Sequence, residues 1–361
     1  MSISPSDSKK RVLSGMRPTG KLHLGNYMGA LHNWVRLQHE YECYFFIADW
    51  HALTTDYADT SQVKDNTREV ALDFLAAGLD PEECVMFVQS AVKQHAELHL
   101  QLSMITPLSW LERVPSYKDQ QEQLKEKDLA TYGFLGYPLL QSADILIYQP
   151  DFVPVGQDQA AHVELTREVA RRFNHFYPRG GRQLIDIPKD EDINSDVKVW
   201  WHGDEILPEP QVLLTPSPKL PGTDGRKMSK SYGNTILLSD PEPVIRQKLK
   251  PMVTDPARVR RTDPGNPELC PVFDLHKVFS SAEVQQKARE GCTTAGIGCI
   301  ECKSWVADAV VAELAPIQER RRKYEAAPEL VKEILEDGTR RATKRAEQTM
   351  IEVRDAMGLG V

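Results

Sequence analysis

The sequence has no long hydrophobic run and no export signal. Nowhere in its 361 residues does an apolar stretch approach the roughly 18 residues that a membrane-spanning helix needs. The segment Met1–Lys10 is polar and lacks the apolar centre of a signal peptide. We therefore expect a cytoplasmic protein with no membrane partner.

The chain also lacks internal repeats, low-complexity tracts and an excess of basic charge. Its formal net charge of −8 argues against a surface that is basic throughout. Basic residues do cluster at 258–261, 320–323 and 340–345. One such cluster is typical of a solvated helix face, but three in the C-terminal part of an acidic chain weaken that interpretation.

Strand-like and helix-like segments alternate from the start of the chain. We expect strands at Arg11–Ser14, Tyr44–Ala48, Val85–Val88 and Val153–Val155, with helices after His23, from Ser61 to Gly78, and from about Gln157 to Phe173. This order predicts βαβ units, and therefore an α/β fold with a parallel sheet and helices on both faces.

Two insertions interrupt the alternation of strands and helices, and the sequence pattern becomes helical in the C-terminal third of the chain. Residues 91–140 are mostly helical in pattern, and residues 180–210 have the composition of a β-hairpin. From about Asp240 the pattern is helical throughout. We expect a catalytic domain at 1–239 and a second, helical domain at 240–361.

The first candidate for chemistry is His23-Leu24-Gly25-Asn26, in a glycine-rich loop after the first strand. Such a loop falls at the carboxyl edge of a parallel sheet, where ligands bind. His23 and Asn26 offer donors, Gly25 offers room, and the following helix N-terminus favours phosphate. Alone, a His-x-Gly sequence is a weak signal.

The second candidate is Lys227-Met228-Ser229-Lys230-Ser231, in the loop Gly222–Gly233. Two lysines on a glycine-bounded loop can neutralise a polyphosphate. A specified pentapeptide arises by chance in a chain of this length only about once in ten thousand sequences. An ordinary exposed basic loop is therefore a poor explanation.

In this order, the two candidates resemble the paired signature of class I aminoacyl-tRNA synthetases. The longer context resembles the tryptophanyl-tRNA synthetase family through the segments Gly15–Gly20, Ala48–Ala52, Val155–Gln159 and Pro316–Arg320. The resemblance covers nearly the whole chain outside residues 1–10 and 180–210. It implies a Rossmann-type catalytic domain, a helical anticodon-binding domain and a homodimer.

The resemblance implies activation of L-tryptophan with ATP and Mg²⁺, followed by transfer to tRNA(Trp). The substrate carboxylate is the nucleophile, so the protein orients reactants and neutralises phosphate charge. No carboxylate cage for Mg²⁺ is visible, consistent with a metal held by phosphates and water. By family correspondence the catalytic residues are His23, Asn26, Lys227 and Lys230, and the ATP-binding residues are Arg17, Thr19, Gly25, Gly156, Asp158, Met228 and Ser229. Lys118 aligns approximately with a phosphate-reaching lysine.

The amino-acid pocket is expected on the segment Tyr137–Asp144. In a helix, Tyr137, Gln141 and Asp144 share one face. The family correspondence gives the substrate ammonium to Tyr137, Gln141 and Gln159, gives the indole N–H to Asp144, and adds His51 to the pocket. Tyrosyl-tRNA synthetases carry a similar helix, whose aspartate accepts from a phenol, so tyrosine remains the alternative substrate.

Six cysteines are present, and four of them lie close together in the second domain. Cys43 and Cys84 stand in or beside apolar runs and are expected to be buried as small hydrophobic residues. Cys270, Cys292, Cys299 and Cys302 suggest a metal before a disulfide. Zinc is the generic expectation for four such thiols. The spacing of the cysteines and the residues that flank them resemble a subset of tryptophanyl-tRNA synthetases that carry a [4Fe–4S] cluster, and we therefore favour the cluster over zinc.

Two more remote interpretations remain. One is a nucleotidyltransferase with a His-x-Gly-x motif and a lysine loop, against which the long helical C-terminal part argues. The other is an iron–sulfur regulatory protein that no longer charges tRNA, against which His23, Asn26, Lys227 and Lys230 argue.

Overall fold

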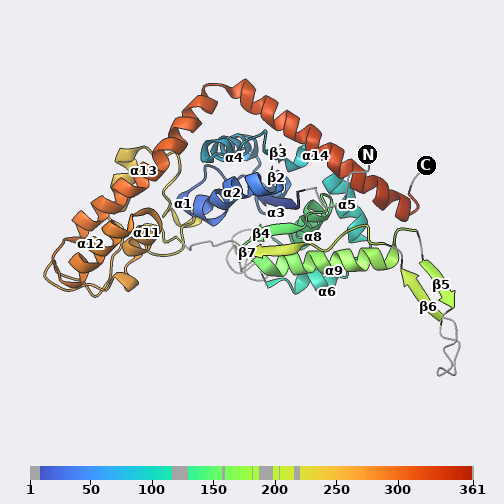
Figure 1. Cartoon of the computed structure of the whole chain (residues 1–361), viewed down its shortest axis with the longest axis horizontal. Helices are drawn as coiled ribbons and strands as arrows, with labels where there is room; N and C mark the ends of the chain where they lie inside the picture. Colours follow the sequence, from blue (N-terminus) through green and yellow to red (C-terminus); the bar gives the residue numbers. More distant parts are fainter. Residues whose placement is uncertain are drawn as a thin grey trace.

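A five-stranded parallel sheet forms the centre of the molecule (Figure 1). The computed structural model describes residues 9–115, 129–156, 159–180, 182–186, 198–202, 204–214 and 220–359. The strands lie in the order β3-β2-β1-β4-β7. They are β1 (Arg11–Met16), β2 (Glu42–Ile47), β3 (Cys84–Val88), β4 (Phe152–Val155) and β7 (Gln211–Leu214). The predicted parallel-sheet α/β class is confirmed.

Alternate residues of the strands serve two separate hydrophobic cores. On β2, Phe45 and Ile47 point into one core, while Tyr44 and Phe46 point into the other. Because both faces are covered, these strands carry the nearly continuous apolar runs that the sequence shows. Cys43 and Cys84 are buried, as expected, and they are partners in the β2–β3 register. Burial is the main cause that raises the pKa of the Cys43 thiol to about 12.

Helices supply the other half of each core. The first core receives α2 (His32–Glu40), α4 (Val63–Ala77), α10 (Glu242–Leu249), α11 (Pro271–Phe279), α12 (Ala282–Thr293) and α13 (Cys299–Glu325). The second receives α5 (Gln94–Ser103), α6 (Leu108–Glu112), α8 (Tyr132–Leu146), α9 (Ala160–Phe176) and α14 (Pro328–Ala356). Within the described ranges no helix is both long and apolar enough to cross a membrane.

An antiparallel strand pair within the predicted insertion 180–210 projects from the body (Figure 1). Its strands β5 (Arg182–Asp186) and β6 (Lys198–His202) pair antiparallel. The acidic stretch between them lies outside the described residues.

The two last helices form a long bent arm over the sheet (Figure 1). Along α14, Gly338 comes so close to the outer edge of β3 that an added Cβ would lie 1.7 Å from the carbonyl oxygen of Met86. Arg341 of the same helix donates to the carbonyl of Cys84. The helix therefore covers an edge strand that would otherwise expose unpaired backbone groups.

Several elements differ from the sequence expectations. The helix after His23 is interrupted: α1 (Leu24–Asn26) passes through a π-helical turn, η1 (Tyr27–Leu31), before α2. Helix α9 begins at Ala160 and ends at Phe176, three residues later at each end than expected. Helix α3 (Asp49–Asp56) and strand β7 were not predicted. Gly78 ends α4 with a φ of 115°, the left-handed C-cap that the sequence indicated.

Candidate active site

A cleft of about 1160 Å³ opens at the carboxyl ends of the parallel strands. Its walls include Gly15 and Met16 at the end of β1, Ala48 after β2, and Val155 and Gly156 at the end of β4. This is the edge at which open parallel sheets bind ligands. Most of the sequence-predicted site residues line the same cleft: Arg17, His23, Gly25, Asn26, His51, Tyr137, Gln141, Asp144, Gly156, Gln159, Lys227, Met228 and Ser229.

The two signature loops, about two hundred residues apart in sequence, lie side by side. His23 forms an isolated antiparallel bridge with Leu237, just beyond the lysine loop. The amide of Leu24 donates to Ile236 at 2.9 Å, and that of Leu238 donates to Leu22 at 2.9 Å. The backbone thus fixes the lysine loop against the first glycine-rich loop.

His23 and Asn26 cap the first helical turn through each other. The Asn26 amide donates to His23 Nδ1 at 3.3 Å, and the His23 amide donates to Asn26 Oδ1 at 3.2 Å. Burial, together with the charge of Lys230, lowers the pKa of His23 to about 4. The imidazole is therefore neutral at physiological pH, and with Nδ1 accepting, its proton sits on Nε2 as a donor. Gly25 leaves the space: a Cβ there would lie 2.9 Å from His23 Nδ1.

Lys230 closes the lysine loop onto the first loop. Its Nζ donates to the Gly20 carbonyl at 2.8 Å and to the Thr19 carbonyl and Oγ1 at 3.1 and 3.3 Å. Burial lowers the pKa of Lys230 to about 8, because partial removal from water disfavours the ammonium. Thr19 itself is exposed and is bonded to Lys230.

Asn234 organises the rest of the lysine loop. Its Oδ1 accepts from the Ser229 amide at 2.8 Å, and its Nδ2 donates to Asp224 Oδ1 at 2.7 Å and to the Lys227 carbonyl at 3.2 Å. Asn234 is buried, whereas the Lys227 side chain is exposed on the cleft wall. Lys227 is thus presented to solvent on a loop whose backbone is held from behind.

Arg17 is held by the neighbouring helix α3. Its Nη2 donates to Thr55 Oγ1 at 2.5 Å and lies 3.6 Å from the Asp56 carboxylate. Burial lowers the pKa of its guanidinium, with Asp56 opposing the shift. Of the other expected ligands, Asp158 and Lys118 lie outside the described residues.

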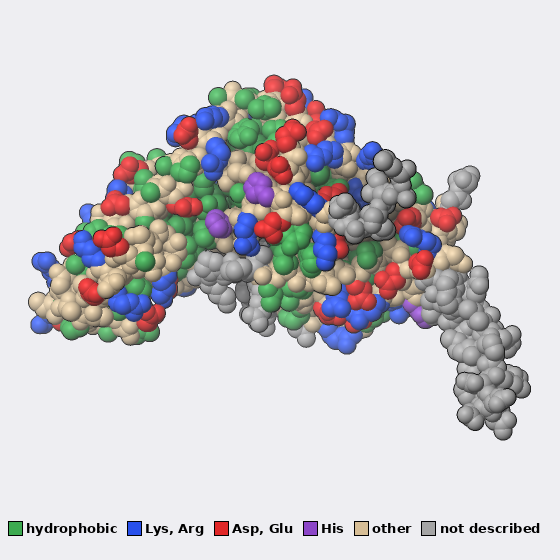
Figure 2. Space-filling model, viewed as in Figure 1, with side chains coloured by type: hydrophobic (Ala, Val, Ile, Leu, Met, Phe, Trp, Pro, Cys, Tyr) green, Lys and Arg blue, Asp and Glu red, His purple; other side chains and the backbone are tan. Residues whose placement is uncertain are grey.

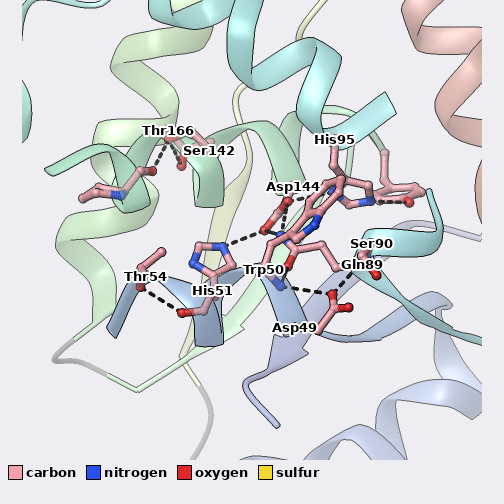
Figure 3. Close-up of polar contacts among 12 residues, drawn as sticks. Asp49, Trp50, His51, Thr54, Gln89, Ser90, His95, Ser142, Asp144 and Thr166 are labelled. Atoms are coloured by element: carbon pink, nitrogen blue, oxygen red, sulfur yellow. Dashed lines mark hydrogen bonds and ion pairs between the residues drawn. The ribbon is translucent and has the colours of Figure 1, made fainter. Parts of the chain in front are cut away.

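Asp144 forms the buried floor of the opposite end of the cleft (Figure 3). Three side chains surround its carboxylate. His51 Nε2 lies 2.8 Å from Oδ2, His95 Nδ1 lies 2.7 Å from Oδ1, and Gln89 Nε2 donates to both oxygens at 2.8 Å. Burial alone would raise the pKa of Asp144, but the hydrogen bonds from His51 and His95 outweigh it and hold that pKa well below its usual range. The carboxylate is therefore ionised despite complete burial.

Tyr137 and Gln141 precede Asp144 along α8 on the cleft side, as the helical spacing predicted. Tyr137 is almost fully buried and packs against Phe134 and His162, with ring centroids 5.6 and 5.8 Å away. Gln159 faces the same space from the start of α9. The arrangement offers polar groups for an ammonium near the cleft centre and an anionic acceptor at its floor.

Sequence reasoning missed Gln89, His95 and Asn234, and also Tyr148, whose hydroxyl lies 2.8 Å from His95 Nε2. A partial signal existed for Gln89, which directly follows the apolar run Val85–Val88 and so falls at the carboxyl end of a strand. His95 lies one helical segment later and gave no local signal. Its contact with Asp144 exists only because α5 packs beside α8 in the folded protein.

Around the four C-terminal cysteines, thiols and cations gather together. Burial first, then the charges of Cys270, Cys292 and Cys299, raise the pKa of the Cys302 thiol to about 12. Arg258 donates from Nη1 to Cys292 Sγ at 3.7 Å, and His276 Nε2 lies 3.3 Å from Cys302 Sγ. Across the residues that the structure describes, no three candidate ligands converge tightly enough to hold a single metal ion.

The basic clusters are largely engaged in structural contacts. Arg258 is buried and donates to the carbonyls of Ile297 and Arg261 at 2.6 and 3.1 Å. Arg321 is buried and pairs with Asp73 and Glu69 of α4. The face in Figure 2 shows Lys and Arg interspersed with Asp and Glu, with no extended basic stripe on that side. Arg258 and Arg321 therefore hold the C-terminal part in place, whereas other members of the clusters, such as Arg260, Arg322 and Lys344, are exposed.

Comparisons with known proteins agree over nearly the full length. The family described as tRNA synthetases class I (W and Y) matches residues 6–315. Tryptophan–tRNA ligases of Ralstonia nicotianae and Thermotoga maritima are 51% and 53% identical, each covering 97% of this chain, which spans 98% and 99% of those proteins. The crystal structure of tryptophanyl-tRNA synthetase from Campylobacter jejuni complexed with ADP and tryptophan matches with a TM-score of 0.81 and 33% identity, over 97% of this chain and 100% of that one. The chain therefore belongs to the class I aminoacyl-tRNA synthetases, in the family of the tryptophan and tyrosine enzymes.

Proposed function

We propose that this enzyme is a tryptophan–tRNA ligase. In its first step, a carboxylate oxygen of L-tryptophan attacks the α-phosphorus of ATP. A C–O–P anhydride forms while the bond between the α- and β-phosphates breaks, and pyrophosphate leaves with the electron pair. In the second step, a hydroxyl of the terminal adenosine of tRNA(Trp) attacks the carbonyl carbon, and AMP leaves. We expect this reaction to take place in the cytoplasm, where translation occurs.

The observation that carries the proposal is one cleft with two chemically different ends. Lys227 and the neutral His23 donor line the phosphate end, where Lys230 bonds to Thr19 and Gly20 of the first loop, and the ionised Asp144 lies at the floor of the other. The developing charge on the phosphates is stabilised by fixed donors and cations. Mg²⁺ travels with ATP as part of the substrate. Arg17, Thr19, Gly25, Asn26, Gly156, Asp158, Met228 and Ser229 are proposed to complete the ATP site.

Tyr137, Gln141 and Gln159 are proposed to hold the tryptophan ammonium, and Asp144 to accept its indole N–H beside His51. A buried anionic acceptor rejects an analogue without the N–H, because its hydrogen bond is then left unmade. The full-length similarity to tryptophan–tRNA ligases favours tryptophan over tyrosine. A solved tyrosyl-tRNA synthetase of Archaeoglobus fulgidus, at 22% identity, shares the fold.

The test is amino-acid-dependent ATP–pyrophosphate exchange with each of the twenty amino acids. Tryptophan should be the preferred substrate by ~10⁴ or more over tyrosine and phenylalanine. Asp144→Ala should reduce kcat/KM for tryptophan and narrow this preference. Faster exchange with tyrosine would contradict the substrate assignment.

The homodimer is proposed from the family resemblance, and the described surface offers a face for it. Leu100 on α5, Met104 directly after α5, Leu108 on α6 and Tyr132 on α8 are large, exposed apolar side chains, and α8 packs against both α5 and α6. A second copy covering this face would remove them from water. Met104→Glu with Leu108→Glu should convert a dimer into a monomer by sedimentation. Unchanged dimerisation would place the interface elsewhere, and a monomeric wild type would reject the dimer.

We further propose a [4Fe–4S] cluster on Cys270, Cys292, Cys299 and Cys302. A buried cation beside the thiols supports an anionic group, because Arg258 donates to Cys292 Sγ at 3.7 Å. In a cluster each thiolate binds a different iron, so the four sulfurs do not need to converge on one point, as they would for zinc. Such a cluster would serve structure and help to shape the helices proposed to read the anticodon.

Protein purified without oxygen tests the cluster. It should be brown, absorb broadly near ~400 nm, and contain iron and sulfide. Cys299→Ser should lose the colour, whereas Cys84→Ala, at a buried thiol of the sheet, should retain it. Colourless anaerobic protein with one bound zinc would decide for zinc, and protein without metal would reject both.

A further inference from the structure

The carboxylate of Asp144 is held from two sides, and only one of them faces the cleft (Figure 3). His51 lines the cleft with Asp144, whereas Gln89 and His95 are fully buried and do not line it. The latter two therefore cannot touch a bound amino acid directly. They act on Asp144 from behind.

A directed chain of hydrogen bonds reaches Asp144 through His95. Because the ionised carboxylate can only accept, His95 Nδ1 carries a proton and donates it to Oδ1 at 2.7 Å. In the tautomer with its proton on Nδ1, Nε2 accepts from the hydroxyl of Tyr148 at 2.8 Å. Asp144 thus sets the tautomer of His95, Tyr148 supports that tautomer from the other ring nitrogen, and His95 holds one oxygen of Asp144.

Aromatic rings enclose this chain. The His95 ring lies 6.0 Å from Phe46, 6.1 Å from Phe87 and 5.4 Å from Tyr148, measured between centroids. All four side chains are buried, so neither water nor another side-chain rotamer can easily replace the hydrogen bond. In such surroundings an aligned hydrogen bond is stronger than it would be in water.

We propose that His95 is a positioning residue for amino-acid specificity. By fixing the plane and the charge of Asp144 from behind, it aims a lone pair of the carboxylate at the indole N–H. A carboxylate without this support could rotate toward His51 or water and would distinguish an N–H from its isostere less sharply. The inference rests on the proposed contact between Asp144 and the indole N–H.

The test compares tryptophan with β-(1-benzothiophen-3-yl)-L-alanine, in which sulfur replaces the indole N–H. The measured quantity is the ratio of the two kcat/KM values in ATP–pyrophosphate exchange, which is independent of the fraction of folded enzyme. His95→Phe should lower this ratio about tenfold or more, through slower use of tryptophan. His95→Asn, which keeps an N–H near the position of Nδ1, should restore part of it. Tyr148→Phe should lower it less.

Tyr44→Phe is the matched control, since Tyr44 stacks on Tyr148 at 5.0 Å but donates to Glu42. Its ratio should equal that of the wild type. If Asp144→Ala lowers the ratio and His95→Phe does not, the positioning role is wrong while the indole contact stands. If Asp144→Ala also leaves the ratio unchanged, the indole contact is wrong and the inference falls with it.

Discussion

In the phosphate half of the cleft, some side chains supply positive charge and others supply an uncharged hydrogen-bond donor. His23 is neutral because burial and Lys230 lower its pKa, so it offers a donor and adds no charge. The positive charge comes from Lys227 and Lys230. Since Lys230 already donates to three oxygens of the first loop, an incoming polyphosphate would exchange these bonds for its own.

Removal of the Lys230 ammonium should slow activation without weakening tryptophan binding. Lys230→Ala is expected to lower kcat by ~10²–10³, the usual cost of losing a charge-stabilising donor. The KM for tryptophan should change little, because that ligand is proposed to bind at the other end of the cleft. Wild-type kcat in pyrophosphate exchange would show that the loop has no catalytic role.

The lowered pKa of Lys230 predicts a pH dependence. A lysine is charged below its pKa, so the rate contribution should be complete well below pH 8 and fall as pH rises through about 8. The fall should appear in kcat/KM for ATP, which reports the free enzyme. Lys230→Arg should move it to higher pH, because a guanidinium stays charged. An identical profile in both enzymes would assign the titration to another group.

Residue roles were predictable where a local motif carries them, and unpredictable where partners meet only in three dimensions. The two signature loops and the face shared by Tyr137, Gln141 and Asp144 follow from spacing along the chain. Their assigned roles in binding remain predictions. His95 reaches Asp144 across 49 residues, and no local pattern encodes that contact.

Helices and strands with a clear hydrophobic periodicity or apolar run were predicted from the sequence, whereas those of mixed polar and apolar composition were not. Strands β1 to β4 follow their apolar runs, and α4 ends at the predicted glycine. Helix α3 has the sequence Asp-Trp-His-Ala-Leu-Thr-Thr-Asp, which shows no clear apolar stripe because it buries His51 and Thr55 beside the cleft. Tertiary packing overrides propensity there.

The contact between α14 and β3 depends on a glycine in the middle of a helix. Gly338→Ala would place a methyl 1.7 Å from the Met86 carbonyl oxygen, so the helix must shift away from the strand. The expected loss is about 1–3 kcal/mol in the free energy of unfolding, measured by denaturant titration. Gly133→Ala, at a helical glycine with open space around it, is the control and should be neutral or slightly stabilising. Equal effects would mean that the close approach is not energetically important.

At the scale of the whole molecule, one buried arginine ties the C-terminal helix α13 to helix α4, which packs beside the catalytic sheet. Arg321 of α13 reaches Asp73 and Glu69 of α4, and Asp73 also accepts from the Leu22 amide, next to His23, at 2.7 Å. Arg321, in the second predicted domain, is therefore linked to the phosphate-binding loop through a single residue, Asp73. The boundary near residue 240 is crossed by these bonds, and the two-domain division stays a prediction.

Loss of this tie should be far more damaging than loss of an exposed pair. Arg321→Ala leaves the Asp73 carboxylate buried without its partner, at a cost of about 3–5 kcal/mol. Arg340→Ala, which removes an exposed pair with Asp337, should change stability by less than about 1 kcal/mol. Equilibrium unfolding of the two variants decides. Comparable losses would show that Arg321 is not an anchor.

The cover that α14 places over β3 has a consequence for synthesis. About 250 residues separate the strand from the helix, which at ribosomal speeds of ~5–20 residues per second is a delay of about 12 to 50 s. Throughout that interval the nascent chain carries an open β edge, a template for pairing with other chains. A chain truncated after Ala327 should therefore aggregate at concentrations where the full chain stays monodisperse by light scattering. A separately supplied peptide of residues 328–359 should suppress that aggregation, and its Gly338→Val version should not.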